Sequence, residues 1–278
     1  MKPWLKKPWQ SMHESCMHRQ RGKSMPTISA VLIVHNEEKN LPECLKRVQA
    51  VADEIVVMDS LSTDGTLAVA RRFTKAVFQQ TFAGFGKQKQ DAIAHATHEW
   101  ILQIDADEHL SDELIRELCE WKRSDPGRYD GFSILFRFYF LGRLMRFGGC
   151  GGERHIRLFK KASAHYGDKP IHEGVCITGP VGRLRHVIIH HSYDSLDEYF
   201  RKFNLYTSLI AQQKFAAGKR FHLWQILRLP YEFITRYIIK LGMLDGMPGL
   251  VYAMISSWYA VMKHIKLWEL ERRRSMKE

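Results

Sequence analysis

The sequence predicts an α/β fold with a mostly parallel central sheet, and three strand-like segments carry that prediction. Residues 28–34, 54–58 and 100–104 are short runs rich in β-branched and other apolar residues, as buried parallel strands require. Acidic residues follow each run, and helical patterns separate the runs. This alternation is typical of a doubly wound sheet, in which ligands bind at the carboxyl ends of the strands.

The first two strands deliver acidic residues to loops at matching positions. Glu37 follows the first strand and Asp59 ends the second, and helices are predicted at 41–48 and 67–73. The segment 62–65, Ser-Thr-Asp-Gly, also has the composition of a turn and a helix N-cap. Capping does not account for acids at both strand ends, so we expect this edge of the sheet to bind a ligand.

The third strand ends in closely spaced carboxylates, Asp105, Asp107 and Glu108. A pair of acids such as Asp105 and Asp107 can be a solvated turn or a helix cap, but hard oxygen ligands also suit Mg²⁺ or Mn²⁺. Either ion can bridge the diphosphate of a nucleotide and neutralise it as it leaves. The three strand ends together therefore predict a divalent cation and a nucleotide diphosphate at one site.

In order and spacing, these segments resemble the family 2 glycosyltransferases, which are inverting enzymes of the GT-A fold that use nucleotide-diphosphate sugars. The resemblance is carried by residues 34–38, 57–66 and 105–108. It implies a GT-A fold and a metal site at Asp105 and Asp107. It also implies a nucleotide-sugar pocket formed by Asn36, Glu37, Asp59, Ser62, Asp64, Lys87 and Asp105.

Lys87 is assigned from the segment 84–90, which precedes a predicted helix at 91–98. The family commonly places a residue that contacts the base or a phosphate in this segment. The alternative is a solvated lysine on the first turn of a helix.

Farther along, the chain resembles the β-1,4-glucosyltransferases of the bacterial lipopolysaccharide inner core. The residues that carry this likeness are 139–143, 148–149, 157–159, 171–174 and 242–250, so the resemblance spans about 25–271. The segment 150–153, Cys-Gly-Gly-Glu, departs from the group, which tends to have an aromatic residue after the paired glycines. This loop is expected to help shape the acceptor site.

An inverting transfer needs a base that removes the proton of the attacking hydroxyl. Glu173 matches the segment on which the family carries its catalytic carboxylate, although His172 and Glu173 could instead form a surface ion pair. For the acceptor, we consider His172, Arg154 and Arg157. The two arginines could hold an acceptor phosphate through bidentate contacts or pair with local acids.

Two histidines, His190 and His191, end the apolar run 187–189. Some GT-A enzymes complete the metal shell with a histidine beyond the catalytic acid, and imidazole is an acceptable Mn²⁺ ligand. His191 is our choice of ligand, and an ordinary structural histidine is the alternative.

The net charge of +12 is confined to the two ends of the chain. Residues 1–25 carry six Lys/Arg and one acid, residues 201–278 carry fourteen and five, and the middle carries 22 and 24. This distribution argues against a nucleic-acid groove in the core. It favours attraction of the flanks to an anionic membrane surface.

The C-terminal region is predicted to be helical and amphipathic. Arg228, Glu232, Arg236 and Lys240 recur every four residues within an apolar stretch, which predicts a polar stripe on one helix face. The next apolar run, 247–262, is shorter than the ~20 residues needed to span a bilayer. We expect a helical hairpin in the membrane interface, and a soluble helical lid is the alternative.

Three regions follow: a basic disordered extension (1–25), a catalytic domain (26–200) and the helical region (201–278). Residues 1–24 lack the apolar segment of a secretory signal, and five scattered cysteines indicate a reducing compartment. We therefore expect a cytoplasmic enzyme, peripheral on the inner membrane.

The sequence thus predicts metal-dependent transfer of glucose from UDP-glucose to a heptose of the lipopolysaccharide inner core. The glucose and the heptose come from the resemblance alone. One alternative is a polyprenyl-phosphate sugar transferase. Another is a membrane protein that binds nucleotide sugars without catalysis.

Overall fold

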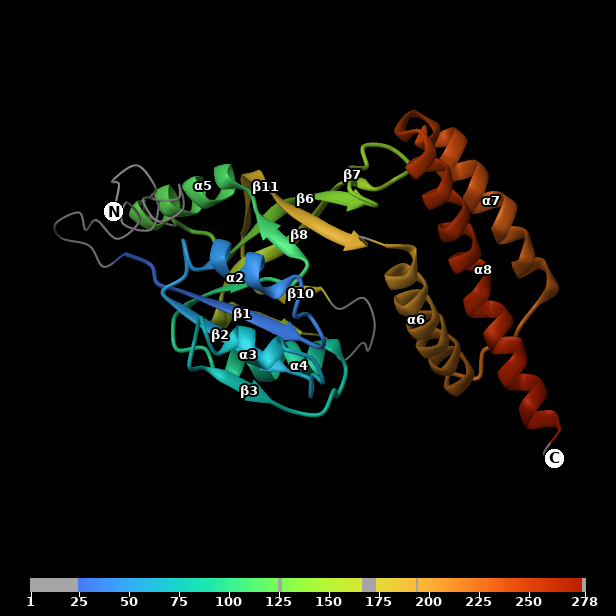
Figure 1. The fold of residues 1–278 in the computed structure, drawn as a ribbon, viewed down its shortest axis with the longest axis horizontal. Coiled ribbons are helices and arrows are strands. Elements are labelled where there is room, and N and C mark those ends of the chain that lie inside the picture. Colours follow the sequence, from blue (N-terminus) through green and yellow to red (C-terminus); the bar gives the residue numbers. More distant parts are fainter. Residues whose placement is uncertain (1–24, 125–126, 167–173, 194, 277–278) are drawn as a thin grey trace. The chain divides into compact units, whose positions relative to one another are not determined.

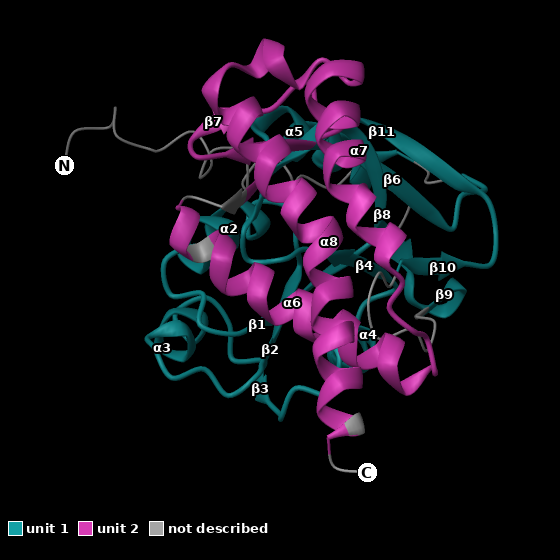
Figure 2. Cartoon of the chain, turned by 90° about the vertical axis from the view of Figure 1, so that its right-hand side faces the viewer, with its two compact units in different colours: residues 1–136, 152–190 teal, residues 137–151, 191–278 magenta. Residues whose placement is uncertain are grey.

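The computed structural model describes residues 25–124, 127–166, 174–193 and 195–276 (Figure 1). The predicted N-terminal extension, apart from Met25, and the site candidates His172 and Glu173 lie outside the described residues. The chain divides into two compact units, coloured separately in Figure 2. The first comprises residues 1–136 and 152–190, and the second comprises residues 137–151 and 191–278.

Within the described residues, nine strands form one sheet, with the order β3-β2-β1-β4-β8-β6-β11-β5 and with β7 paired to β6. Their bounds are β1 (Ile28–Val34), β2 (Glu54–Asp59), β3 (Val77–Gln79), β4 (Trp100–Gln103), β5 (Glu108–Leu110), β6 (Gly131–Phe140), β7 (Arg143–Leu144), β8 (Gly151–Lys160) and β11 (Val181–Tyr193). Strands β1 to β4 pair in parallel, whereas β8 joins β4 and β5 joins β11 in antiparallel fashion. A separate pair consists of β9 (Ala164–Tyr166) and β10 (Val175–Ile177). The predicted α/β fold with a mostly parallel sheet is confirmed.

Strand β1 lies at the centre of the parallel half because both of its faces are apolar. Leu32 packs in the cluster that includes α2 (Leu41–Val48) and α5 (Asp112–Arg123). Its neighbour Val31 belongs to a second cluster, with α4 (Phe85–Ala94). Successive side chains of a strand point to opposite faces, so helices cover both faces of β1.

The register of the parallel strands sets the ligand edge. Val34 at the end of β1 pairs with Asp59 at the end of β2, so the loops that follow both strands leave the sheet side by side. The helix after β2, α3, spans Thr66–Ala70. The next helix, α4, begins at Phe85 rather than at the predicted residue 91. Gly84, just before it, has a φ of 103°, a backbone conformation that glycine adopts without a steric penalty.

The second unit consists mainly of helices. These are α6 (Leu196–Ala216), η3 (Leu223–Leu227), α7 (Arg228–Ile234), η4 (Thr235–Ile239), η5 (Gly242–Asp245) and α8 (Met247–Ser275). The buried carboxylate of Asp245 accepts hydrogen bonds from the backbone N–H groups of Arg146 and Phe147, at 3.1 and 2.9 Å. These bonds join the segment 137–151 to η5. The segment was predicted to belong to the catalytic domain.

None of the described helices is both long enough and apolar enough to cross a bilayer. Of the cysteines in the described part of the chain, Cys44, Cys150 and Cys176 form no disulfide.

Within the second unit, Lys214 on α6 lies among other basic groups. Its Nζ is 3.2 Å from Nε2 of the buried His264 on α8. Burial first, and then the charges of Lys263, Arg228 and Lys219, lower the pKa of Lys214 to about 8. Burial and the charge of Lys214 lower the pKa of His264 to about 4, so the imidazole is neutral at pH 7 and can accept a hydrogen bond from Lys214.

Replacing Lys214 with Met is expected to raise the thermal midpoint at pH 7 by about 2 °C, a small gain because the site is partly solvent-screened. A base whose folded pKa is depressed destabilises the fold below that pKa, and the penalty disappears as pH rises through the unfolded value. The gain should therefore shrink between pH 8 and about pH 10.4. Thermal unfolding across this range, with the exposed Lys75→Met as control, tests it. An equal gain at every pH would contradict the electrostatic account.

Candidate active site

Hydrogen bonds connect the loops that follow β1 and β2. Asn36 has a φ of 56°, a left-handed conformation that asparagine tolerates better than most residues. Its Oδ1 accepts from the backbone N–H of Thr63 at 2.8 Å, and its own N–H donates to Oγ of Ser62 at 2.9 Å. The N–H of Glu37 donates to Oγ1 of Thr66 at 2.8 Å. These hydrogen bonds therefore join the two loops at the carboxyl edge of the sheet.

The carboxylate of Asp59, at the end of β2, is buried. It accepts hydrogen bonds from the N–H of Ser62 at 3.0 Å, from the Ser62 hydroxyl, and from Nε2 of Gln79 at 3.1 Å. Asp64 accepts from the N–H groups of Thr66 and Glu38. Although desolvation raises the pKa of Asp64, the hydrogen bonds from Thr66 outweigh it, so the pKa is lowered and the side chain stays ionised.

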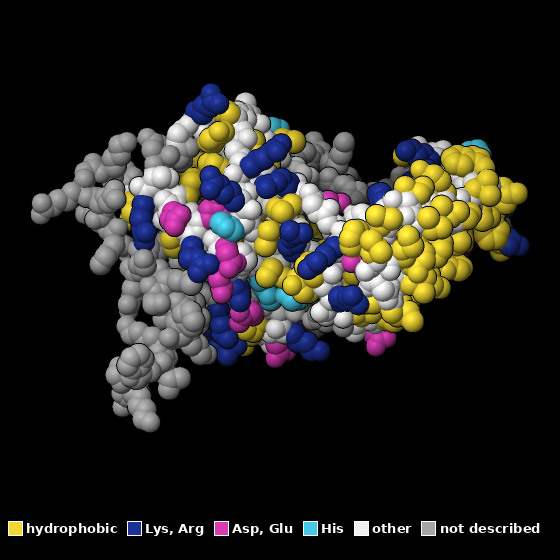
Figure 3. Space-filling view, turned by 90° about the horizontal axis from the view of Figure 1, so that it is seen from above, with side chains coloured by type: hydrophobic (Ala, Val, Ile, Leu, Met, Phe, Trp, Pro, Cys, Tyr) yellow, Lys and Arg dark blue, Asp and Glu magenta, His cyan; other side chains and the backbone are white. Residues whose placement is uncertain are grey.

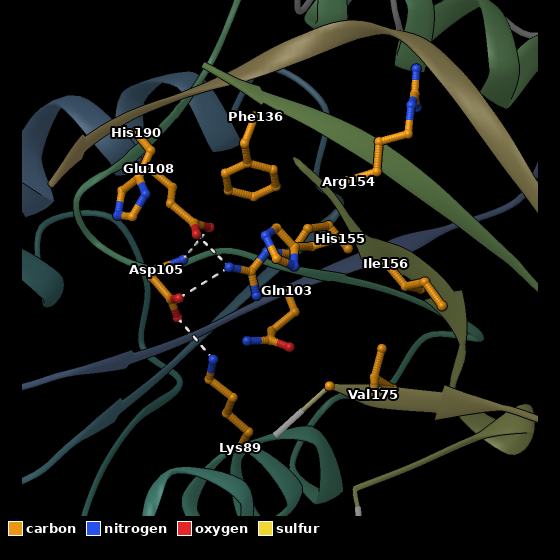
Figure 4. Close-up of a pocket in the computed structure, with 12 residues that line it drawn as sticks. Lys89, Gln103, Asp105, Glu108, Phe136, Arg154, His155, Ile156, Val175 and His190 are labelled. Carbon is orange, nitrogen blue, oxygen red and sulfur yellow. Dashed lines mark hydrogen bonds and ion pairs between the residues drawn. The ribbon is translucent and has the colours of Figure 1, made fainter. Parts of the chain in front are cut away.

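Acidic and basic side chains from several elements lie close together near the end of β4, as Figure 4 shows. Asp105 lies 3.3 Å from Nζ of Lys89 and 3.2 Å from the guanidinium of Arg157. Arg157 also pairs with Glu108, which is 2% exposed and accepts a hydrogen bond from the N–H of Asp105 at 3.0 Å. Arg157 therefore holds two carboxylates next to each other.

Burial and charge act in opposite directions on these two acids. Desolvation raises the pKa of Asp105. The charges of Lys89 and Arg157 lower it by a larger amount, so the net shift is downward. For Glu108, desolvation dominates over the attraction of Arg157 and raises the pKa to about 7. The cluster thus keeps Asp105 ionised, whereas Glu108 can take up a proton near neutral pH.

His190, rather than the predicted His191, lies beside Asp107. Its Nε2 is 3.4 Å from Oδ2 of Asp107, because the antiparallel register of β11 and β5 sets His190 opposite Glu108. Burial lowers the pKa of His190, but the hydrogen bond and charge of Asp107 raise it above its usual value. His191 stacks on Tyr139 in the second unit, with the ring centroids 5.2 Å apart.

A cavity of about 410 Å³ lies next to this cluster, within the first unit. Its lining residues are Lys89, Gln103, Asp105, Glu108, Phe136, Arg154, His155, Ile156, Arg157, Gly174, Val175 and His190. Its size is that of a small-molecule site. Gly174 and Val175 directly follow the predicted catalytic residue Glu173 in the sequence.

Among the predicted site residues that the structure describes, Asp105, Arg154 and Arg157 line this cavity. Arg154 donates to the carbonyl oxygens of Ser133 and Leu184, at 3.1 and 3.0 Å. The predicted nucleotide residues Asn36, Glu37, Asp59, Ser62 and Asp64 form the loop network described above and do not line it. Lys87 is largely exposed and pairs with Asp91, one helical turn away.

Sequence reasoning did not assign a role to Lys89, Gln103, Glu108, Phe136 or His155. Lys89 lies in the segment from which Lys87 was chosen, two residues farther along. Gln103 is a polar residue at the end of an apolar strand, a signal that could have found it. Phe136 and His155 come from the antiparallel strands β6 and β8, and no motif identifies them.

The donor atoms at this edge fit a divalent cation by type, because Asp105 and Asp107 provide carboxylate oxygens and His190 an imidazole. Within the described residues, however, no three acidic, histidine or cysteine side chains are gathered in a geometry that could hold a metal. The carboxylates are instead paired with Lys89, Arg157 and His190.

A mostly parallel sheet with acidic loops at one edge, beside a cavity lined by carboxylates and basic groups, is the architecture of an α/β enzyme that binds a small molecule at the carboxyl ends of its strands. Residues 29–177, more than half of the chain, match the family described as "Glycosyl transferase family 2". The chain belongs to glycosyltransferase family 2, and it is a glycosyltransferase.

Curated relatives match along most of the chain. A lipopolysaccharide core biosynthesis glycosyltransferase, LpsC of Rhizobium meliloti, is 30% identical over 250 residues, which cover 87% of this chain and 92% of the relative. An uncharacterized glycosyltransferase of Rickettsia typhi is 26% identical over 257 residues, or 88% of each chain. A solved mannosyltransferase of Pyrobaculum calidifontis, in complex with GDP-Man and Mn²⁺, is 15% identical with a TM-score of 0.46, over 91% of this chain and 80% of that one.

Proposed function

We propose that this glycosyltransferase moves glucose from UDP-glucose to a heptose of the lipopolysaccharide inner core, with inversion at the anomeric carbon. The observation that carries the proposal is the cavity in which Asp105 and Glu108 face Arg157 and Lys89, at the carboxyl edge of a family 2 sheet. The donor sugar and the heptose are supported by the motif resemblance alone, and the lipopolysaccharide core is supported also by the similarity to LpsC across nearly the whole chain.

On the donor side, the joined loops after β1 and β2 would hold the nucleoside, with Asp59 at the base and Asp105 at the ribose. Asp107 and Asp105 would hold Mg²⁺ or Mn²⁺ through their carboxylates, and His190 lies beside Asp107. When bound, such an ion neutralises the diphosphate leaving group. Lys89 is paired with Asp105 and would add positive charge on the phosphate side.

On the acceptor side, Glu173 would accept the proton of the attacking hydroxyl. The residues that follow it, Gly174 and Val175, line the cavity next to Asp105 and Arg157. Arg154 would contact the acceptor, with His172 as a further candidate. Arg157 is already bonded to two carboxylates, so its first role would be to hold them in position.

Mass spectrometry of truncated inner-core lipopolysaccharide, incubated with the protein, UDP-glucose and Mg²⁺ or Mn²⁺, tests the proposal. The expected result is a gain of one hexose with the wild type and a loss of at least about 10²-fold in rate with Asp107→Ala. A wild type that binds UDP but transfers nothing to this acceptor would overturn the lipopolysaccharide assignment. A polyprenyl phosphate would then be the acceptor to test.

We place the enzyme at the cytoplasmic face of the inner membrane, as a peripheral protein. The support is the basic C-terminal region, with fourteen Lys/Arg and five acids between residues 201 and 278, together with a lipid-linked acceptor.

A further inference from the structure

The second unit exposes a continuous set of large apolar side chains between residues 223 and 247, here called the apolar face. Six of its members are 56–76% exposed: Leu223, Leu227, Tyr231, Ile239, Leu244 and Met247. Figure 3 shows hydrophobic side chains gathered over the helices of this unit. Contiguous apolar patches of this kind on soluble proteins mark interaction sites.

The predicted polar stripe of this segment is turned toward the protein at Glu232 and Arg236. Arg236 Nε lies 3.4 Å from Glu232, and its Nη1 donates to the carbonyl of Gly148 at 3.2 Å. Its guanidinium also lies over the ring of Tyr252 on α8, 5.7 Å from the centroid. A helix on a water-facing surface has the opposite orientation, with its polar side outward. The outward side of α7 and η4 is therefore suited to an apolar medium.

Cations paired with aromatic rings accompany this face. Arg228 lies over Trp224 at 6.0 Å, and farther along the unit Lys263 lies over Tyr259 at 5.7 Å and Arg272 over Trp268 at 5.6 Å. In each pair the cation follows the ring by four residues, on the same helical side. Tryptophan and tyrosine rings are enriched where a protein meets the headgroup layer of a bilayer, and the charged ends of Lys and Arg side chains reach toward the same layer.

A bilayer or a second copy of the chain could cover the apolar face, and the charge around the face distinguishes between them. Residues 219–263 carry six Lys/Arg and two acids. One of these acids, Asp245, is buried and bonded to backbone N–H groups, and the other, Glu232, is paired with Arg236. A symmetric dimer through this face would bring like charges together, and neither of these two acids would be left to pair with them. An anionic bilayer accepts both the apolar side chains and the cations.

We propose that the apolar face inserts into the interfacial layer of an anionic bilayer, with Arg228 and Lys240 at the level of the lipid phosphates. This inference rests on the proposed peripheral location and names the surface responsible for it. Segments η3, α7, η4 and η5 lie in the plane of the interface and do not cross it.

Flotation of the full chain with phosphatidylcholine vesicles, with and without phosphatidylglycerol, tests this surface. Wild type should float with the anionic vesicles, and Leu227→Glu or Ile239→Glu should lower the partition coefficient at least about tenfold, because a charge replaces an inserted apolar group. Val181→Glu, at an exposed apolar residue of the first unit, is the matched control and should float as the wild type does. Lys240→Gln should weaken binding to the anionic vesicles alone.

The proposal falls if the wild type does not float, or if the glutamate variants float equally well. It also falls if sedimentation without vesicles shows a dimer that Leu227→Glu dissociates, because the apolar face would then be a contact between copies. UDP affinity, measured on every variant, verifies that the fold is intact. Vesicle binding without UDP binding by the wild type would overturn the proposed function and leave the membrane surface standing.

Discussion

Replacing Glu173 with Gln is expected to lower the rate of sugar transfer by about 10³-fold, because general-base catalysis contributes factors of this size. Glutamine keeps the size of the side chain but cannot accept a proton at neutral pH. UDP should bind the variant with an affinity within about twofold of wild type, since the donor contacts proposed above involve other residues. Single-turnover transfer and calorimetric UDP titration measure the two quantities separately.

Glu120→Gln provides the matched control, since Glu120 is an exposed carboxylate on α5 in the same unit and does not line the cavity. It should transfer sugar at the wild-type rate. If Glu173→Gln retained more than about a tenth of the wild-type rate, another group would be the base. If both activity and UDP binding were lost, the residue would belong to the donor site or to the fold.

Replacing Arg157 with Met is expected to lower the free energy of unfolding by about 3–5 kcal/mol, the usual cost of removing one partner of a buried ion pair. The Arg157 side chain is 13% exposed and pairs with both Asp105 and Glu108. It also lies over the ring of Phe136, 5.3 Å from the centroid. Methionine preserves most of the packing, so the loss would come chiefly from the buried Glu108 left without its cation, whereas the partly exposed Asp105 would still pair with Lys89.

The pH dependence of that loss distinguishes charge from packing. The pKa of Glu108 is already raised to about 7, and removal of Arg157 should raise it further. An acid with a raised folded pKa costs stability as pH rises from its unfolded value toward its folded value. Urea unfolding at pH 5.5 and pH 8 should therefore show the larger loss at pH 8. Adding Glu108→Gln should recover part of it, and a loss that is equal at both pH values would point to packing.

The parallel half of the fold was predictable because the local sequence of each strand reflects which of its faces are buried. Residues 28–34 are apolar on both faces because helices cover both sides of β1, and the predicted segment coincides with the observed strand. The acids at 59 and 105 follow their strands directly, so local spacing alone located them at the ligand edge.

The antiparallel half was not predictable in the same way. His190 lies beside Asp107 because β11 pairs with β5, and these strands are more than 70 residues apart in the chain. Spacing within the sequence carries no information about such a pairing, and two adjacent histidines on a strand differ only in the face to which they point. The choice between His190 and His191 therefore depended on the tertiary register.

The helical region shows a related limit. The four-residue recurrence from Arg228 to Lys240 predicted a face with charged residues, and two of the four, Glu232 and Arg236, pair with each other. Periodicity separates two faces of a helix, but it does not say which one meets the rest of the protein. The contacts of Arg236 with Gly148 and Tyr252 supplied that direction.

The hydrogen bonds between the loops after β1 and β2 have a consequence for the thermodynamics of donor binding. Asn36 is bonded to Thr63 and Ser62, and Glu37 to Thr66, so hydrogen bonds within the protein itself hold these loops together. Loops that are already ordered lose little conformational entropy when a ligand arrives, so more of the contact energy appears as affinity. UDP binding should accordingly cause little change in amide hydrogen exchange in these two loops.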